Sequence, residues 1–197
     1  MKLDMVHDIQ TAYRKLVDSM SRPGTISDLS EEAGKLERDQ ALLPGTLILA
    51  QMLLDTEVTF KVISQREAMA AHMLNQLTYA KEADVEEADF IFVLNDAAPG
   101  AWLRTLEAVK IGELNDPHSS ATVIIETESL SGGTTLRLTG PGIQHTAYVG
   151  LQLKEDWVDV RAERNAEFPL GLDLLFTDAN HRVLALPRTT QVVKEEV

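Results

Sequence analysis

The chain has 197 residues, with 31 acidic and 18 basic side chains and a formal net charge of −13. Hydrophobic residues make up 44% and charged residues 25%, which excludes wholesale disorder. The absence of cysteine excludes disulfides, thiolate metal sites and a cysteine nucleophile. The acidic balance argues against nucleic-acid binding, because Lys and Arg must neutralise phosphates there. It also works against a polyanionic substrate, unless basic groups gather locally.

No segment at the start of the chain has the pattern of a signal peptide, because Met1-Lys2-Leu3-Asp4 leads directly into a predicted helix. The most apolar stretch, residues 47–54, is far shorter than the about 20 residues that span a bilayer. We therefore expect a cytoplasmic protein that forms one domain over residues 1–197.

Helices and strands interleave in the first part of the chain. Apolar residues at steps of three and four predict an amphipathic helix over 6–20, which Pro23-Gly24 ends. Segment 28–40 is polar and is predicted to be loop or a short exposed helix. Ser64 and Glu67 have the spacing of a capping box. After residue 40 we expect five elements in chain order. They are a buried helix opened by Pro44 over 44–54, a strand over 58–62, a helix over 65–77, a strand covered on both faces over 90–94, and a helix over 100–112.

Strands dominate the second part. Segments 121–127 and 135–139 have strand patterns, and Ser131-Gly132-Gly133 between them predicts a hairpin turn. Segment 156–167 is compatible with a helix, and 172–177 with 183–186 predicts a second hairpin. The fold class is α/β, a mixed β-sheet with helices on both faces.

Two segments are candidate anion-binding sites. The backbone N–H groups of Ser131, Gly132 and Gly133 can cradle a phosphate, because glycines permit close approach of a ligand. Arg188, with Thr189 and Thr190, follows a buried strand and suits phosphate or phosphonate oxygens. The alternatives are a plain turn for the first segment and an Arg–carboxylate pair for the second. Arg22 carries the same ambiguity.

Asp173 lies inside the apolar run 172–176, and a buried carboxylate is costly unless it is paired. It is either a functional buried carboxylate or a side chain that alternation directs toward solvent or an arginine. The scattered histidines have no metal-ligand spacing, so we expect no metal; they are His7, His72, His118, His145 and His181. We also find no signature of an acyl-transfer nucleophile and no Walker lysine.

Four segments taken together resemble the PhnH family, a subunit of the bacterial carbon–phosphorus lyase system for phosphonate breakdown. They are Tyr13-Arg14 through Met20-Ser21-Arg22-Pro23-Gly24, Ser129-Leu130-Ser131-Gly132-Gly133 with Leu136 to Ile143, Phe168-Pro169-Leu170-Gly171-Leu172-Asp173, and Ala185-Leu186-Pro187-Arg188-Thr189-Thr190. Segment 27–117 matches in pattern only. Tyr13 and Ser19 depart from the residues that are usual there, Phe and Ala.

The resemblance implies a fold similar to a reduced pyridoxal-phosphate transferase domain, without any cofactor. It also implies a homodimer that joins the G, I and J subunits in a core complex, with ATP and phosphonate as ligands within that complex. The assembly forms alpha-D-ribose 1-methylphosphonate 5-triphosphate from ATP and methylphosphonate, as a transferase. The resemblance carries no established catalytic residue, so the roles of Arg137 and the other positions above are hypotheses.

Three functions therefore compete. The first is an assembly subunit, which predicts an exposed apolar patch or groove. The second is an independent enzyme on a phosphorylated ligand, for example with pyridoxal phosphate, although its lysines sit in polar or boundary contexts; these are Lys61, Lys81, Lys110 and Lys154. The third is a nucleotide-binding regulator that uses the Gly132-Gly133 turn and Arg188.

Overall fold

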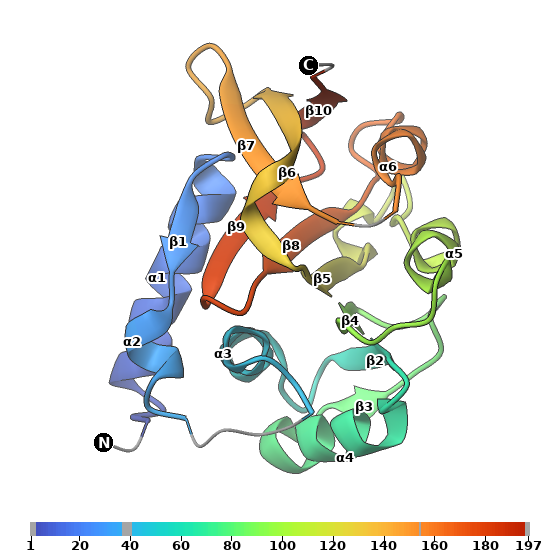
Figure 1. Cartoon of the computed structure of the whole chain (residues 1–197). Coiled ribbons are helices and arrows are strands. Elements are labelled where there is room, and N and C mark those ends of the chain that lie inside the picture. The colour runs from blue at the N-terminus through green and yellow to red at the C-terminus, as the bar shows by residue number, and fades with distance from the viewer. Residues whose placement is uncertain (1–2, 37–40, 154, 196–197) are drawn as a thin grey trace.

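The computed structural model describes residues 3–36, 41–153 and 155–195, and two β-sheets organise it (Figure 1). The larger sheet contains β1 (Ile26–Asp28), β2 (Thr59–Ile63), β3 (Lys81–Glu82), β4 (Phe90–Val93), β5 (Thr122–Glu126), β8 (Asp173–Thr177) and β9 (Arg182–Leu186). The smaller contains β6 (Ser129–Thr139), β7 (Ala147–Gln152) and β10 (Gln191–Lys194). The strand orders are β1-β9-β8-β5-β4-β2-β3 and β10-β6-β7.

The larger sheet is mixed, as the sequence predicts. Strands β3, β2, β4, β5 and β8 run parallel, β9 pairs antiparallel with β8, and β1 pairs antiparallel with β9 at the outside of the sheet. Strand β4 is a continuous apolar run because its two faces are both buried, which is usual for a central parallel strand. The carboxyl ends of β2, β4, β5 and β8 therefore lie next to one another at the same end of the sheet.

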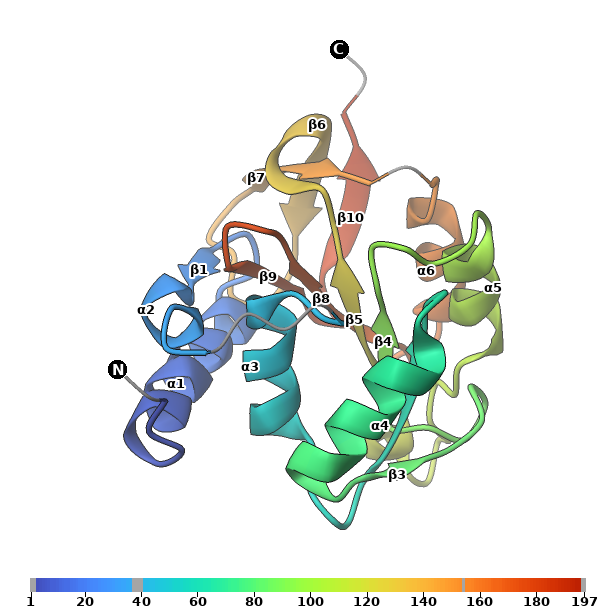
Figure 2. The ribbon, with the colours of Figure 1, turned by 60° about the horizontal axis from the view of Figure 1, so that its bottom comes forward.

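Helices cover both faces of this sheet, which confirms the predicted architecture. One core packs under α1 (His7–Ser21), α3 (Pro44–Leu53) and α4 (Glu67–Thr78), which lie side by side in Figure 2. The other packs under α5 (Ala101–Ala108) and α6 (Val158–Arg164). Alternation along β4 divides the strand between them, because Phe92 enters the first core and Ile91 the second. The short helix α2 (Ser30–Ala33) and a 3₁₀ turn (Pro117–Ser119) complete the described elements.

The smaller sheet shares the second core. Leu136 and Leu138 of β6 and Val149 and Leu151 of β7 are buried together with residues of β4, β5, β8 and β9. No helix within the described ranges combines the length and the apolar character needed to cross a bilayer.

The predicted hairpin between 121–127 and 135–139 is wrong. Strand β5 pairs in parallel with β4 and β8, and β6 pairs with β7 instead. The segment Ser131–Gly133 lies inside β6, where the register with β7 shifts between Ser129 and Thr134. Both glycines have positive φ, and a Cβ on Gly133 would lie 2.7 Å from the carbonyl oxygen of Leu151. The glycines thus serve a bulge with close strand approach rather than a turn.

The capping box is wrong as well. The hydroxyl of Ser64 accepts a hydrogen bond from the backbone N–H of Arg66 (2.8 Å) and donates to Asp96 (2.6 Å). Glu67 does not reach back to Ser64, because Lys61 holds its carboxylate at 2.7 Å. Helix α4 therefore begins at Glu67 itself.

Candidate functional site

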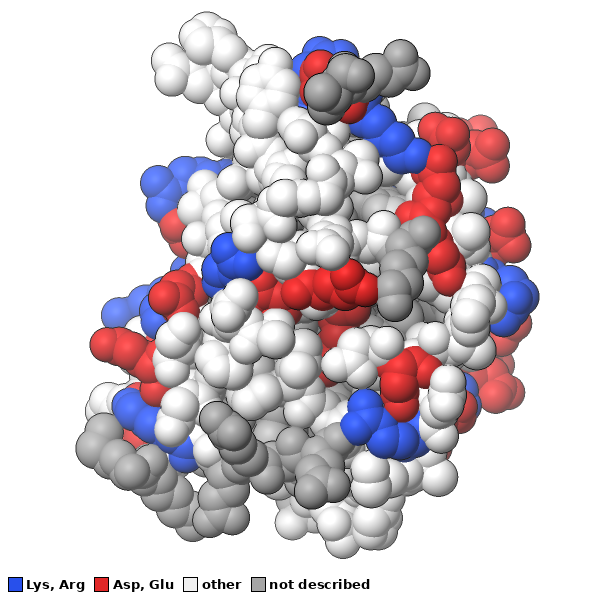
Figure 3. Space-filling model, viewed as in Figure 1, with Lys and Arg blue, Asp and Glu red and all other residues white. Residues whose placement is uncertain are grey.

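A cleft opens at the edge where the parallel strands end. Two adjoining cavities, of about 250 and 490 Å³, share Leu43, Asn95, Glu126 and Ala179 in their walls. Asn95 and Ala179 follow β4 and β8, and Glu126 is the last residue of β5. Figure 3 shows acidic side chains along a hollow that crosses this face between the smaller sheet and α3. Ligands of open α/β sheets bind at this edge, so the cleft is the candidate functional site.

Glu126 joins three elements at the base of the cleft. Its carboxylate accepts hydrogen bonds from the backbone N–H of Leu43 (2.7 Å) and the hydroxyl of Thr46 (2.7 Å), at the amino end of α3. Its second oxygen accepts from the backbone N–H of Asn95 (3.1 Å). Burial raises the pKa of the Glu126 carboxyl above its usual value, although these bonds and the charge of Arg66 favour the ionised form.

Two further carboxylates lie near the starts of neighbouring helices. Glu155 accepts a hydrogen bond from the backbone N–H of Gly100 (2.6 Å), which caps α5. Asp96 accepts from Ser64 at the start of α4. A helix amino terminus is where phosphate binds in many α/β proteins. Here Glu126 and Glu155 occupy such positions at α3 and α5, so phosphate would have to displace them.

The smaller cavity has largely apolar walls. Trp102, Ile125 and Leu153 line it, and the indole N–H of Trp102 is buried without a hydrogen-bond partner. One carboxylate oxygen of Glu155 is also unpartnered. Apolar walls with a few polar groups that have no internal partner are typical of a pocket for an organic ligand. The arrangement can accept and donate single hydrogen bonds to a small ligand.

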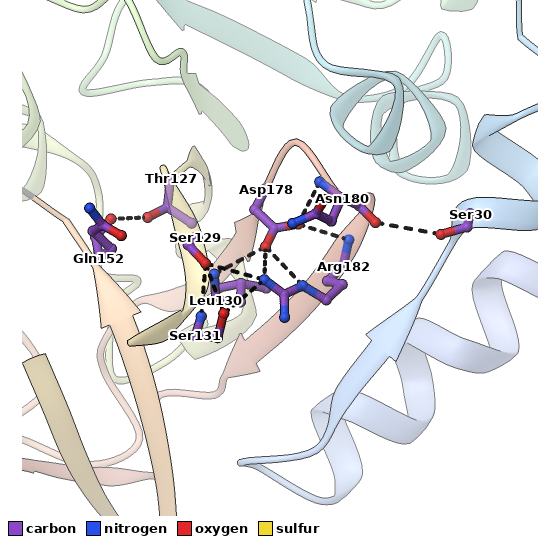
Figure 4. Close-up of polar contacts among 9 residues, drawn as sticks. All are labelled: Ser30, Thr127, Ser129, Leu130, Ser131, Gln152, Asp178, Asn180 and Arg182. Atoms are coloured by element: carbon purple, nitrogen blue, oxygen red, sulfur yellow. Dashed lines mark hydrogen bonds and ion pairs between the residues drawn. The ribbon is translucent and has the colours of Figure 1, made fainter. Parts of the chain in front are cut away.

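Beside the cleft, Asp178 organises a second polar cluster (Figure 4). Its side chain is fully buried. It accepts hydrogen bonds from Arg182 at 2.9 Å (Nε) and 2.6 Å (Nη2) and from the backbone N–H of Leu130 at 3.0 Å. Arg182 also donates to the hydroxyls of Ser129 (3.2 Å) and Ser131 (3.4 Å). The cluster fixes the β8–β9 hairpin to the start of β6.

The charge of Arg182 also acts on the titration of Asp178. Burial alone would raise the pKa of the Asp178 carboxyl, but the hydrogen bonds from Arg182 and Leu130 outweigh it and lower the pKa.

Arg188 and Asp173 form a third cluster. The guanidinium of Arg188 lies 2.7 Å from the carboxylate of Asp173, and the Arg188 backbone N–H donates to the same carboxylate at 2.7 Å. The guanidinium also donates to Ser120 (2.5 Å) and to the carbonyls of Pro117 (2.8 Å) and Pro169 (3.3 Å). These contacts favour the alternative reading of Arg188 and of Asp173, an internal ion pair.

The candidate anion-binding residues do not meet. Asp173, the partner of Arg188, opens β8, whereas the Arg182 that contacts Ser131 lies beyond the other end of that strand. Arg137 pairs with Glu195 (2.9 Å) on the smaller sheet, where both side chains are partly exposed. Thr190 is buried and Thr189 half-buried. Anion binding by Ser131, Gly132, Gly133, Arg137, Arg188, Thr189 or Thr190 stays a prediction.

Comparison with known proteins identifies the chain's relatives. The family model described as bacterial phosphonate metabolism protein (PhnH) matches residues 2–193. The chain belongs to the PhnH family. It is 34% identical over 185 residues to a protein of Stutzerimonas stutzeri named as C-P lyase subunit protein HtxG, a match that covers 93% of this chain and 85% of that protein. It is 32% identical over 198 residues to the alpha-D-ribose 1-methylphosphonate 5-triphosphate synthase subunit PhnH of Rhizobium meliloti (strain 1021), covering 98% and 94%.

The match confirms the resemblance drawn from four short segments and extends it through 27–117, where only the pattern agreed. Within the described parts of this PhnH chain, no three His, Asp or Glu side chains are arranged to hold a metal ion. Of the lysines considered for a cofactor, Lys61 pairs with Glu67 and Lys110 with Asp89 (2.6 Å), while Lys81 is exposed. Lys154 lies outside the described residues. The likeness to a pyridoxal-phosphate transferase domain stays a prediction.

Sequence reasoning missed three buried charged groups that hold this chain together, Arg161, Glu126 and Asp178. Arg161 is only 2% exposed and donates to the carbonyls of Thr190 (3.0 Å) and Pro187 (2.8 Å), and burial lowers its pKa to about 10. Arg161 lies four residues after the buried Trp157, and residues four apart share one face of a helix, so this spacing could have predicted that Arg161 is buried. Glu126 and Asp178 each end or follow an apolar strand, which is where polar site residues gather in parallel sheets.

Proposed function

We propose that this chain is a subunit of a carbon–phosphorus lyase complex that acts in phosphonate catabolism. It contributes to the formation of alpha-D-ribose 1-methylphosphonate 5-triphosphate from ATP and methylphosphonate, mainly as an assembly subunit. The observation that carries the proposal is the match over nearly the whole chain to a relative named as a subunit of that synthase and to one named as a C-P lyase subunit. The proposed partners are the G, I and J subunits and a second copy of the chain, in the cytoplasm.

The described structure supports an assembly role rather than one in phosphate chemistry. The amino ends of α3 and α5 are taken by Glu126 and Glu155, and Arg188 is held by Asp173. Each of these charged groups is bound by other groups of the same chain. A rigid subunit of this kind contributes by presenting a surface to neighbours.

The test is genetic complementation followed by co-purification. A strain that lacks its own PhnH regains growth on methylphosphonate as sole phosphorus source when it expresses this chain, and the tagged chain elutes with the G, I and J subunits in size-exclusion chromatography. A truncated chain that ends before β8 serves as the control. Migration of the intact chain alone, in a sample where the other subunits assemble, contradicts the proposal.

The division between assembly and catalysis has its own experiment. The purified chain is incubated with ATP and methylphosphonate, and the ribose phosphonate product is sought by ³¹P NMR. We expect no product from the chain alone and product from the assembled complex. Turnover by the chain alone would replace the assembly role with the alternative of an independent enzyme.

A further inference from the structure

Two loops at the amino ends of the parallel strands each expose one large apolar side chain. Leu114 lies between α5 and β5 and is 72% exposed, and Phe168 lies between α6 and β8 and is 76% exposed. These are the two most exposed of the large hydrophobic side chains in the described structure. Single exposed apolar residues are ordinary, so their relative position decides whether they matter.

The two loops are joined to each other. The backbone N–H of Gly171 donates to the carbonyl of Ile111 (3.0 Å), and one nitrogen of Arg188 donates to the carbonyls of both Pro117 and Pro169. Leu114 lies three residues before Pro117, and Phe168 lies one residue before Pro169. The same nitrogen of Arg188 therefore joins the two loops that carry them. The loops that carry the two side chains are therefore neighbours.

The backbone under this surface is held in place. Gly112 has a φ of +83°, and a Cβ there would lie 2.7 Å from the carbonyl oxygen of Pro117, so the first loop folds closely on itself. Glu113 and Asp116 exchange backbone hydrogen bonds at 3.1 and 2.9 Å. Since its own backbone hydrogen bonds hold the first loop, docking through Leu114 loses little conformational entropy.

The rim of this surface is acidic. Glu113 and Glu167 directly precede the two apolar side chains in the sequence, Glu163 lies near the end of α6, and all three are exposed. The arginines of the same region face inward, because Arg164 donates to the carbonyl of Val109 and Arg188 binds Asp173. A second copy of this chain would bring like charges together, which is costly, whereas a basic surface would be attracted.

We propose that Leu114 and Phe168 form the centre of a docking surface for a partner subunit whose contact face is basic and has apolar pockets. The inference rests on the proposed function, since it names where the chain meets the complex. An apolar centre surrounded by a polar rim is the usual arrangement of a protein–protein interface.

The test compares three chains in the co-purification described above. The double variant Leu114→Ser/Phe168→Ser is expected to bind the other subunits at least tenfold more weakly, whereas Tyr79→Ser, which removes a 71% exposed aromatic after α4 on the other face of the sheet, is expected to bind as the original chain does. The changed side chains are exposed, so thermal melting should be the same in all three. Retention of the double variant in the complex overturns the docking surface and leaves the proposed function intact. Failure of the unchanged chain to bind overturns the proposed function, and the docking surface with it.

A charge-reversal variant separates a basic partner from a second copy. Glu163→Lys/Glu167→Lys should weaken assembly with the other subunits and reduce the dependence of binding on salt, because attraction across the rim is lost. If this variant instead assembles normally, or if the Leu114→Ser/Phe168→Ser variant dissociates only a homodimer, the partner is not the basic subunit proposed here.

Discussion

Glu126 and Asp178 are two buried carboxylates at the ends of neighbouring strands, yet they are held in different ways. Glu126 pairs in register with Thr177, the residue before Asp178. Asp178 meets the guanidinium of Arg182, with hydrogen bonds at 2.6 and 2.9 Å. The donors to Glu126 are two backbone N–H groups and a hydroxyl. The pKa of Asp178 is lowered, whereas that of Glu126 is raised.

The difference lies in what offsets the loss of water. A buried charge with a cation against it stays ionised and holds that cation, so Asp178 fixes the β8–β9 hairpin. Neutral donors compensate less, so burial keeps the pKa of Glu126 raised and disfavours its ionised form. The Glu126 carboxylate binds the donors at the amino end of α3, which would otherwise be able to bind the anion of a ligand.

Removal of the Asp178 carboxylate should have the largest effect. Asp178→Ala leaves Arg182 without its counter-charge and the backbone N–H of Leu130 without an acceptor. Breaking a buried pair in this way costs about 3–5 kcal/mol of unfolding free energy. Chemical denaturation measures it, with Asp159→Ala at an exposed position of α6 as the control of equal charge change. A loss under about 1 kcal/mol would show that the cluster in Figure 4 is incidental.

Substitution of Glu126 should have a smaller effect. Glu126→Gln keeps an oxygen for Leu43 and Thr46 but turns an amide N–H₂ toward the backbone N–H of Asn95. An unsatisfied buried donor costs about 1–3 kcal/mol, and removal of the buried charge offsets part of that. The exposed Glu86→Gln is the matched control for denaturation. A cost equal to that of Asp178→Ala would mean that the two carboxylates are held alike.

The two groups should also give opposite pH dependences. The pKa of Glu126 is raised in the folded state, so its contribution to stability is complete below its unfolded pKa and is lost as pH rises through the folded pKa. The pKa of Asp178 is lowered, so its contribution is present above the unfolded pKa and is lost as pH falls through the folded one. Denaturation from pH 3 to 8 should show the stability gap to Glu126→Gln shrinking with rising pH and the gap to Asp178→Ala growing. Parallel curves contradict this assignment.

Much of the larger sheet could be predicted because its elements carry local signals. The amphipathic period of α1 and the apolar run of β4 each identify an element without reference to a partner. Ser131–Gly133 misled because paired glycines mark both a turn and a bulge, and only the position of β7 distinguishes them. Strand β3 has two exposed residues, so it has no apolar pattern to detect.

The candidate site was less predictable for a related reason. Arg188 and Asp173 are 15 residues apart, and their sequence allows a free arginine and a paired one equally until β8 and β9 are placed side by side. Glu126 looks like the polar end of an apolar strand, and its role depends on α3, which lies 80 residues earlier. Clusters formed by long-range contacts need the topology first.

Disruption of the Arg137–Glu195 pair should change the unfolding free energy least. It is the exposed reference against which the losses at Asp178 and Glu126 are compared. Its atoms are 2.9 Å apart, the same distance as the longer of the two Asp178–Arg182 hydrogen bonds, but its side chains are 41% and 40% exposed. Water already solvates both charges, so Arg137→Gln should change the unfolding free energy by less than about 1 kcal/mol, and added salt should remove that change. Denaturation with and without 0.5 M salt measures it, and Glu195→Gln should give the same small value. If Arg137→Gln costs several kcal/mol, then distance rather than burial sets the strength of these pairs, and the contrast between Asp178 and Glu126 needs another explanation.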